Sequence, residues 1–298
     1  MEIVVRQTSG LGNQLFQYAA GQNLAKKHGA SLRIAHELDK NIHLHGSPRP
    51  VMLQKFSITA PIGEADGFDR FILSVRPRLR MITDVVCGLR RIQIFREPAN
   101  ASATAVRPSF PVSSSTRRVY LQGYWQDSTL VSEVEPELRK QFSLVSPLSR
   151  RSSEVQQQIQ ASQHPVSLHL RRGDYLTVFG TSAVLPPDYY RTAVDSMHRR
   201  FADSSFFVFS DDARYAKELF GHDPRFRIVD HNDALSAHED LMLMASCHHH
   251  IIANSTFSWW GAWLNPRPDK VVIAPSKWLG FNTVNSTIAL PSWHLIEI

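Results

Sequence analysis

The chain has 298 residues, which suits one large domain or two medium ones, and 43% of them are hydrophobic, enough for a substantial core. A formal net charge of +6 and a pI near 9.5 favour anionic partners such as nucleic acids, phosphate esters or an acidic membrane face. Cysteine occurs only at Cys87 and Cys247, which excludes a disulfide framework and favours a reducing compartment. No apolar run reaches membrane-spanning length and the N-terminus lacks the features of a signal peptide, so we expect a cytoplasmic protein.

The first half opens with a predicted βαβ unit. A strand at 3–6 precedes a turn at 9–13, a helix over 14–28 that ends before Gly29, and a strand at 31–35. Residues 40–115 show no clear pattern, and 97–116 is expected to be a loop. A strand at 119–124, a helix at 129–142 and a polar, solvated helix at 147–163 follow.

The second half alternates regularly between short apolar runs and helical patterns. Strands are expected at 166–170, 205–209, 227–229, 250–253 and 271–274, and helices at 188–201, 213–220, 234–246 and 256–264. Repeated βα units predict a doubly wound parallel sheet, which binds ligands at the carboxyl ends of its strands.

Two candidate binding motifs contain glycine turns or arginines after a strand. GLGNQ at 10–14 could bind a phosphate, but it lacks both the full G-x-G-x-x-G spacing and a P-loop lysine, so a tight turn that opens a helix explains it equally well. HLRRGDY at 169–175 places two guanidinium groups where they can grip a phosphate bidentately, unless Arg172 and Asp174 form an exposed ion pair instead. Since neighbouring strand residues point to opposite faces, Arg171 and Arg172 can serve one site only if the strand ends before them.

Two further motifs carry carboxylates and hydroxyls. In FSDD at 209–212 the paired aspartates could bind a metal, exchange protons or cap the next helix, and capping is the plainer explanation for one of them. The hydroxyls at 255–258 could cradle an anion at a helix start, although capping followed by core tryptophans accounts for them too. The run of histidines at 248–250 lacks partners at zinc-site spacing, so no metal site is expected.

Together, GLGNQLFQYA at 10–19, HLRRGDY at 169–175, FSDD at 209–212 and NSTFSWWGAWL at 254–264 resemble the α-1,2-fucosyltransferase family of inverting glycosyltransferases. The resemblance implies an α/β fold of GT-B architecture, with two Rossmann-like doubly wound domains facing across a cleft. Residues 1–150 would form the acceptor side and residues 151–298 would bind the donor substrate, GDP-fucose, without a metal or other cofactor. The implied reaction transfers L-fucose to O-2 of a galactose-type residue on an oligosaccharide.

The resemblance also implies roles for individual residues near the donor. Arg171 matches the arginine on the donor β-phosphate, with His169 and Arg172 beside it, and Asp174 is the nearest carboxylate that could accept the acceptor's proton. The loop at the pyrophosphate and fucose corresponds to Asn254, Ser255, Thr256, Phe257 and Ser258.

The remaining matched residues are more scattered. Asp240 corresponds, across an alignment gap, to the carboxylate that reads guanine, and Asp212 to a structural or nucleotide-side aspartate. Gly12, Asn13 and Gln14 lie on the cleft edge of the N-terminal domain, near fucose or acceptor. Residues 40–115 match no motif, and we expect them to determine acceptor identity.

The resemblance implies a bacterial enzyme that makes surface polysaccharide (O-antigen), because relatives in secretory compartments carry a membrane anchor and none is expected here. The alternatives are a sugar transferase of different linkage or metal dependence, or a nucleic-acid-binding protein. Residues 71–96 carry six arginines, at 76, 78, 80, 90, 91 and 96. They predict contact with the acidic inner leaflet or with a lipid-linked pyrophosphate acceptor, or else an amphipathic helix pair with a solvated basic face.

Overall fold

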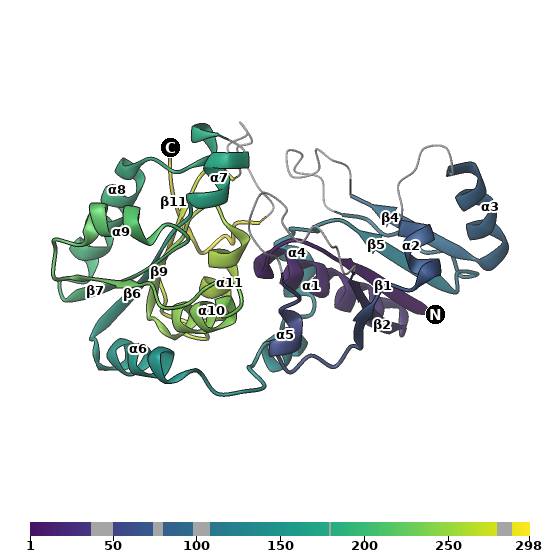
Figure 1. Cartoon of the computed structure of the whole chain (residues 1–298), viewed down its shortest axis with the longest axis horizontal. Helices are drawn as coiled ribbons and strands as arrows, with labels where there is room; N and C mark the ends of the chain where they lie inside the picture. Colours follow the sequence, from purple (N-terminus) through teal and green to yellow (C-terminus); the bar gives the residue numbers. More distant parts are fainter. Residues whose placement is uncertain (37–49, 74–79, 98–107, 179, 279–287) are drawn as a thin grey trace. The chain divides into compact units, whose positions relative to one another are not determined.

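The computed structural model describes residues 1–298 except for 37–49, 74–79, 98–107, 179 and 279–287. It divides into two compact units, one containing Met1–Ile42 and Val51–Val145 and the other containing Ser146–Ile298 (Figure 1). The division falls between Val145 and Ser146, a few residues before the expected boundary at 150. Each unit holds its own parallel sheet.

The first unit is built on a five-stranded sheet with the order β3-β2-β1-β5-β4. Every neighbouring pair runs parallel. Its strands are β1 (Glu2–Gln7), β2 (Ser31–His36), β3 (Ile62–Glu64), β4 (Ile92–Arg96) and β5 (Arg118–Gln122). Its helices are α1 (Leu11–His28), α2 (Gly67–Leu73), α3 (Arg80–Arg90), α4 (Ser128–Ser132) and α5 (Glu135–Gln141), with a short 3₁₀ turn at Leu53–Lys55.

The second unit is built on a six-stranded sheet with the order β11-β10-β9-β6-β7-β8, again parallel throughout. Its strands are β6 (His164–Leu170), β7 (Ser204–Ser210), β8 (Phe226–Val229), β9 (His249–Ile251), β10 (Val272–Pro275) and β11 (His294–Ile296). Its helices are α6 (Arg150–Ala161), α7 (Gly173–Val178), α8 (Pro187–Arg200), α9 (Ala213–Phe220), α10 (Ala237–Ser246) and α11 (Thr256–Leu264), with a 3₁₀ turn at Thr181–Ala183.

The predicted βαβ opening is confirmed in the first unit. Gly10 stands at the start of α1 in an extended conformation, and Gly29 ends the helix with φ at 56°, a left-handed conformation that glycine adopts without strain. Strands β1 and β2 then pair in parallel from Glu2 opposite Ser31 to Gln7 opposite His36.

Two expected elements of the first half are wrong in detail. The helix predicted over 129–142 is interrupted and forms α4 and α5, because Pro136 lies in the first turn of α5 and has no N–H to continue the ladder. The strand expected to reach 124 stops at Gln122, and Trp125 adopts a positive φ of 53° shortly afterwards.

The second sheet follows the predicted alternation, with strand and helix ends shifted by a few residues. Strands β6 and β7 are buried along most of their length, as expected of central strands covered by helices on both faces. The helix expected over 147–163 begins only at Arg150, behind the capping Ser149, and it buries Ser152, Val155 and Ile159 rather than being solvated all round.

Three tryptophans of α11 pack in a cluster with Trp293. The ring of Trp259 lies 4.9 Å from that of Trp260, 6.3 Å from that of Trp263 and 5.7 Å from that of Trp293. Trp259 and Trp260 are fully buried. The tryptophans therefore belong to the core, and the polar residues before them form the exposed end of the motif.

The arginine-rich stretch at 71–96 contains the end of α2, the whole of α3 and β4. The positions of Arg76 and Arg78, and the side chain of Arg80, lie outside what the structure describes. Within the described residues, no helix combines the length and the apolar character that a membrane span requires.

Candidate active site

Two arginines and two aspartates meet where β6 and β7 end side by side. Strand β6 stops at Leu170, so both Arg171 and Arg172 lie beyond it, which satisfies the condition for serving one site. The Arg172 guanidinium lies 2.7 Å from the Asp212 carboxylate, and that of Arg171 lies 3.3 Å from Asp211. The ion pair considered between Arg172 and Asp174 is thus replaced by a pairing across neighbouring strands.

Asp211 organises this corner through two polar contacts and the close approach of Gly173. Besides its ion pair with Arg171, its carboxylate accepts a hydrogen bond from the Arg172 N–H at 2.9 Å. A Cβ on Gly173 would come within 2.9 Å of the same carboxylate, so a larger residue there would displace the carboxylate. Sequence reasoning had grouped Asp211 with its neighbour without giving it a role, and the signal that could have found it is its place after β7.

Asp212 both caps a helix and holds an arginine. Its carboxylate accepts from the Tyr215 N–H at 3.0 Å at the start of α9, as the capping interpretation predicts. The Tyr215 N–H and then the Arg172 guanidinium hold the pKa of Asp212 below its usual value. Arg172 also lies 4.2 Å over the Tyr215 ring, so its guanidinium is fixed on two sides.

His169 is the buried member of the arginine motif. Burial, with Arg171 as a second cause, lowers its pKa to about 3, so the imidazole is neutral at physiological pH. Its ring centroid lies 5.6 Å from that of Phe257, and its Nδ1 forms no hydrogen bond within the described residues. His169 therefore joins the arginine motif to the loop before α11 by packing.

The loop before α11 presents a helix N-terminus beside that motif. Ser255 caps the helix by accepting from the Phe257 N–H, and the hydroxyl of buried Ser258 donates to backbone carbonyls within the loop. Thr256 and Phe257 remain partly exposed. The first N–H groups of a helix carry partial positive charge, and the Phe257 N–H is already used by the Ser255 cap, so the start of α11 can attract an anion at Thr256.

The loop is tied to the arginine motif by a hydrogen bond as well as by packing. The Tyr175 hydroxyl donates to the Asn254 carbonyl at 2.9 Å, and the Asn254 amide donates to the Ala183 carbonyl. Tyr175 was quoted in the motif without a role. Asp174 is the second residue of α7, and its side chain lies outside what the structure describes, so its part as a base stays a prediction.

Asp240 stands in the first turn of α10, the helix after β8. The Asn232 amide donates to its carboxylate at 2.6 Å, yet burial raises the pKa of Asp240 to about 7. One turn further along α10, Met244 belongs to the apolar cluster against which Phe257 packs. Asn232 belongs to no motif, and sequence reasoning missed it.

The predicted residues of the first unit occupy the first turn of α1, directly after the connection from β1. The side-chain oxygen of Gln14 accepts from the Gln7 side-chain amide at 2.6 Å and from the backbone N–H of Met52. The side-chain amide of Gln14 donates to the backbone carbonyl of Ser9. Asn13 is more exposed, and its amide contacts the Ser9 hydroxyl while its carbonyl accepts from Gln126. Buried Gly12 completes this turn. Gln14 thus maintains the turn's shape, and Asn13 is the member that a ligand could reach.

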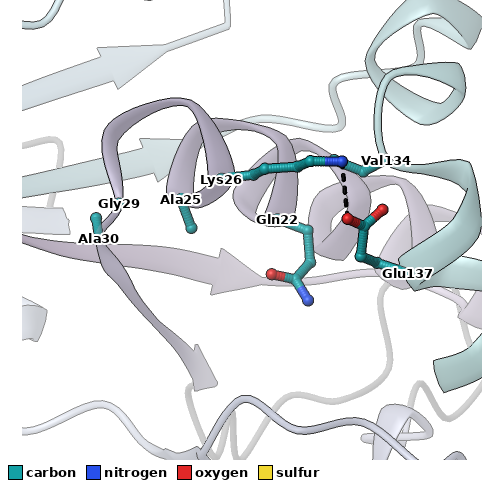
Figure 2. Close-up of a pocket in the computed structure, with 7 residues that line it drawn as sticks. All are labelled: Gln22, Ala25, Lys26, Gly29, Ala30, Val134 and Glu137. Atoms are coloured by element: carbon teal, nitrogen blue, oxygen red, sulfur yellow. Dashed lines mark ion pairs between the residues drawn. The ribbon is translucent and has the colours of Figure 1, made fainter.

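A separate pocket lies between α1 and α5 and contains none of the predicted residues. It is lined by Gln22, Ala25, Lys26, Gly29, Ala30, Val134 and Glu137 and has a volume of about 310 Å³. Figure 2 shows its two charged side chains, Lys26 and Glu137, joined in an ion pair of 2.7 Å. Because these charges neutralise each other, the pocket offers little to a charged ligand.

The histidine run is structural. His250 is fully buried between the Ser167 hydroxyl and the Asn265 amide, and His249 stacks on Phe201 at 4.0 Å. Among the residues with described positions, no three histidine, cysteine, aspartate or glutamate side chains are grouped so as to hold a metal ion.

Comparisons with known proteins identify a family for the chain. The sequence model of Glycosyl transferase family 11 covers residues 104–297. The O-antigen biosynthesis glycosyltransferase WbnK of Escherichia coli is 31% identical over 96% of this chain and 97% of its own length. An alpha-1,2-colitosyltransferase of Escherichia coli is 30% identical over 99% of both chains.

The fold has solved counterparts as well. NodZ, a fucosyltransferase from Bradyrhizobium solved as an alpha-1,6-fucosyltransferase soaked with GDP-fucose, matches with a TM-score of 0.52, covering 89% of this chain and 92% of its own at 16% identity. The two parallel-sheet units therefore have the GT-B fold, as predicted. With its four motifs, its paired arginines and a family match over most of its length, the chain belongs to glycosyl transferase family 11.

Proposed function

We propose that this glycosyltransferase carries out inverting transfer of L-fucose from GDP-fucose to O-2 of a galactose-type residue on an oligosaccharide of bacterial surface polysaccharide. The observation that carries the proposal is the pair Arg171 and Arg172, held by two aspartates beside the N-terminus of α11. This corner presents guanidinium N–H donors, each arginine held in place by an aspartate, next to the partial positive charge of a helix N-terminus, and these groups can bind a pyrophosphate. Two relatives support the sugar and the linkage, since one is an alpha-1,2-colitosyltransferase and another, human, is a galactoside alpha-(1,2)-fucosyltransferase at 26% identity over 48% of this chain.

The chemistry follows from the charges. As the bond from the fucose anomeric carbon to the β-phosphate oxygen breaks, negative charge grows on the phosphate, and Arg171 with the N–H groups at the start of α11 stabilises it. The acceptor hydroxyl forms the new bond from the opposite face of the ring and releases its proton, which inverts the anomeric configuration. Asp174 is the proposed acceptor of that proton.

Neutral His169 suits a place beside this charge. A neutral imidazole can lie near a departing phosphate without adding positive charge. Its packing against Phe257 holds the arginine motif beside the loop before α11. Arginines and a helix N-terminus can neutralise a diphosphate without a divalent cation, so we propose a metal-independent reaction. Activity that survives chelation with EDTA would support this, and loss restored by a divalent cation would contradict it.

The donor sugar has one specific competitor. Colitose is fucose without its 3-hydroxyl, and a relative that matches the whole chain bears its name. Purified protein should be given GDP-fucose and GDP-colitose in parallel with a panel of galactosides and glucosides, and the product linkage determined by NMR. An α-1,2-fucosyl galactoside formed at the higher kcat/KM supports the proposal, whereas preference for GDP-colitose or another linkage contradicts it.

A further inference from the structure

Helix α3 carries an exposed apolar stripe that the fold does not use. Thr83 and Cys87 are buried on one face, and Cys87 packs in the apolar cluster beneath the helix. Ile82, Val85 and Leu89 are 51%, 58% and 81% exposed. Their spacing places them on one side of the helix, turned away from the buried residues. We call these three residues the α3 stripe.

The α3 stripe is unusual for this protein. The other large hydrophobic side chains that are exposed in the described chain, namely Met1, Tyr124, Val145, Leu235 and Leu295, lie apart from one another in the sequence. Single exposed apolar residues are ordinary, but aligned ones on one helix mark a surface that contacts something apolar.

Positive charge lies at the C-terminal end of the stripe. Residues 80–96 contain four arginines and, as their one acidic residue, Asp84. Arg90 and Arg91 are exposed at the end of α3, and neither forms an ion pair within the described parts of the chain. The Arg90 guanidinium lies 4.7 Å over the Phe68 ring of α2, so it is held beside the helix. Figure 1 shows α3 beside β4, the edge strand of the first sheet.

From this combination we propose that α3 docks the first unit on an anionic lipid surface, with Ile82, Val85 and Leu89 inserted among the acyl chains and Arg90 and Arg91 at the headgroups. An amphipathic helix with a basic border binds in the interface plane, and anionic lipids attract each nearby arginine. A second copy of the chain fits less well, because a symmetric contact through this face would bring the same arginines together. A nucleic acid fits less well too, since the centre of the face is apolar.

The experiment compares co-sedimentation of the full chain with vesicles of phosphatidylcholine alone and of phosphatidylcholine with phosphatidylglycerol. We expect binding to the mixed vesicles only, weakening as salt is added. The variant Ile82→Ser/Val85→Ser/Leu89→Ser should lose at least about tenfold in vesicle affinity. Leu235→Ser/Leu295→Ser, which removes similarly exposed leucines from the second unit, is the matched control and should bind as wild type.

Two further readouts keep the result unambiguous. Equal unfolding midpoints for the triple variant and wild type show that the loss comes from the surface and not from misfolding. The proposal is overturned if binding ignores anionic lipid, if the triple serine variant binds normally, or if sedimentation shows a dimer that this variant dissociates. None of these outcomes depends on which sugar the enzyme transfers, so the donor proposal stands or fails separately.

Discussion

Arg172 and Asp212 lie 2.7 Å apart at the ends of neighbouring strands, although forty positions separate them in the sequence. The aspartate is at the same time the cap of α9. The orientation of the arginine is therefore coupled to the start of the helix that follows β7. A change at Asp212 should alter both stability and donor binding, and two substitutions can separate these effects.

Asp212→Asn and Asp212→Ala provide that separation. Asparagine caps a helix about as well as aspartate, so Asp212→Asn should cost less than about 1 kcal/mol of unfolding free energy, and Asp212→Ala about 1–2 kcal/mol. Both should raise the KM for the donor, because both release Arg172. Urea unfolding and donor kinetics measure the two effects. Equal stability losses for the two variants would show that capping contributes little.

Arg171→Ala should reduce kcat/KM by about 10²–10³-fold, the usual cost of removing a group that stabilises charge only in the transition state. Arg171→Lys should recover part of the rate, because it restores the charge without the planar fork. Steady-state kinetics with saturating acceptor measure the loss. A near-normal rate for the alanine variant would refute the role of Arg171 at the leaving phosphate.

Gly173→Ala tests the close approach of Asp211. The added Cβ would lie 2.9 Å from the carboxylate, which must move and abandon its contacts with Arg171 and the Arg172 N–H. We expect about a tenfold loss in kcat/KM with a modest loss of stability, since a small displacement of catalytic groups is costly. Gly67→Ala is the matched control, because a Cβ there meets nothing within 4 Å, and it should retain full activity.

Donor affinity should rise with pH around neutrality. The pKa of Asp240 is raised to about 7 by burial, so in the free protein much of this carboxyl is protonated at pH 6 to 7. We propose that Asp240 binds guanine, as the family resemblance implies. Only the carboxylate can accept two guanine N–H bonds, so GDP-fucose affinity should increase up to about tenfold per pH unit below 7 and level off above it. Calorimetric titration across this range measures the trend. Asp240→Asn should bind more weakly and lose this dependence, and an unchanged dependence would assign the titration to another group.

Folding stability should fall as the pH drops below about 6.5. The pKa of His169 is lowered to about 3 and that of His249 to about 4, mainly by burial, and burial also holds that of His250 well below its usual value. The unfolded chain therefore binds more protons than the folded one between pH 6.5 and 4, which costs up to about 1.4 kcal/mol per pH unit for each histidine.

Asp240 opposes this trend over the same interval, because its raised pKa makes the folded chain hold a proton that the unfolded chain has released. One aspartate against three histidines leaves a net loss toward acid. Urea unfolding over a pH series tests it, and His169→Phe, which keeps a ring but cannot titrate, should flatten the slope. A wild-type slope in that variant would contradict the assignment.

The second sheet could be predicted because its central strands are continuous apolar runs that end in recognisable motifs. The strands that the sequence did not reveal are short or at a sheet edge. β3 and β11 have three residues each, and β4 lies within an arginine-rich stretch whose sequence pattern predicts helices. The break between α4 and α5 depends on one proline, Pro136, in an otherwise helical pattern.

The candidate site, like the fold, could be predicted only in part. The sequence predicted that Arg171, Arg172 and Asp212 lie together, because polar residues after parallel strands meet at one edge of the sheet. It could not identify the pairings, since Arg171 with Asp211 and Asn232 with Asp240 depend on how loops close in space. Nor could it show that Gln14 is committed to the β1–α1 turn, because exposed and buried glutamines look alike in sequence.

The tryptophans in and beside α11 give the protein an intrinsic fluorescent probe. Every tryptophan except Trp125 lies in the second unit, and Trp259 sits at the centre of the cluster. Exchanging Trp125 for phenylalanine would therefore confine the fluorescence to the second unit. The melting of that unit, and its response to nucleotides, could then be followed without labelling, while Trp125 reports on the other unit by difference.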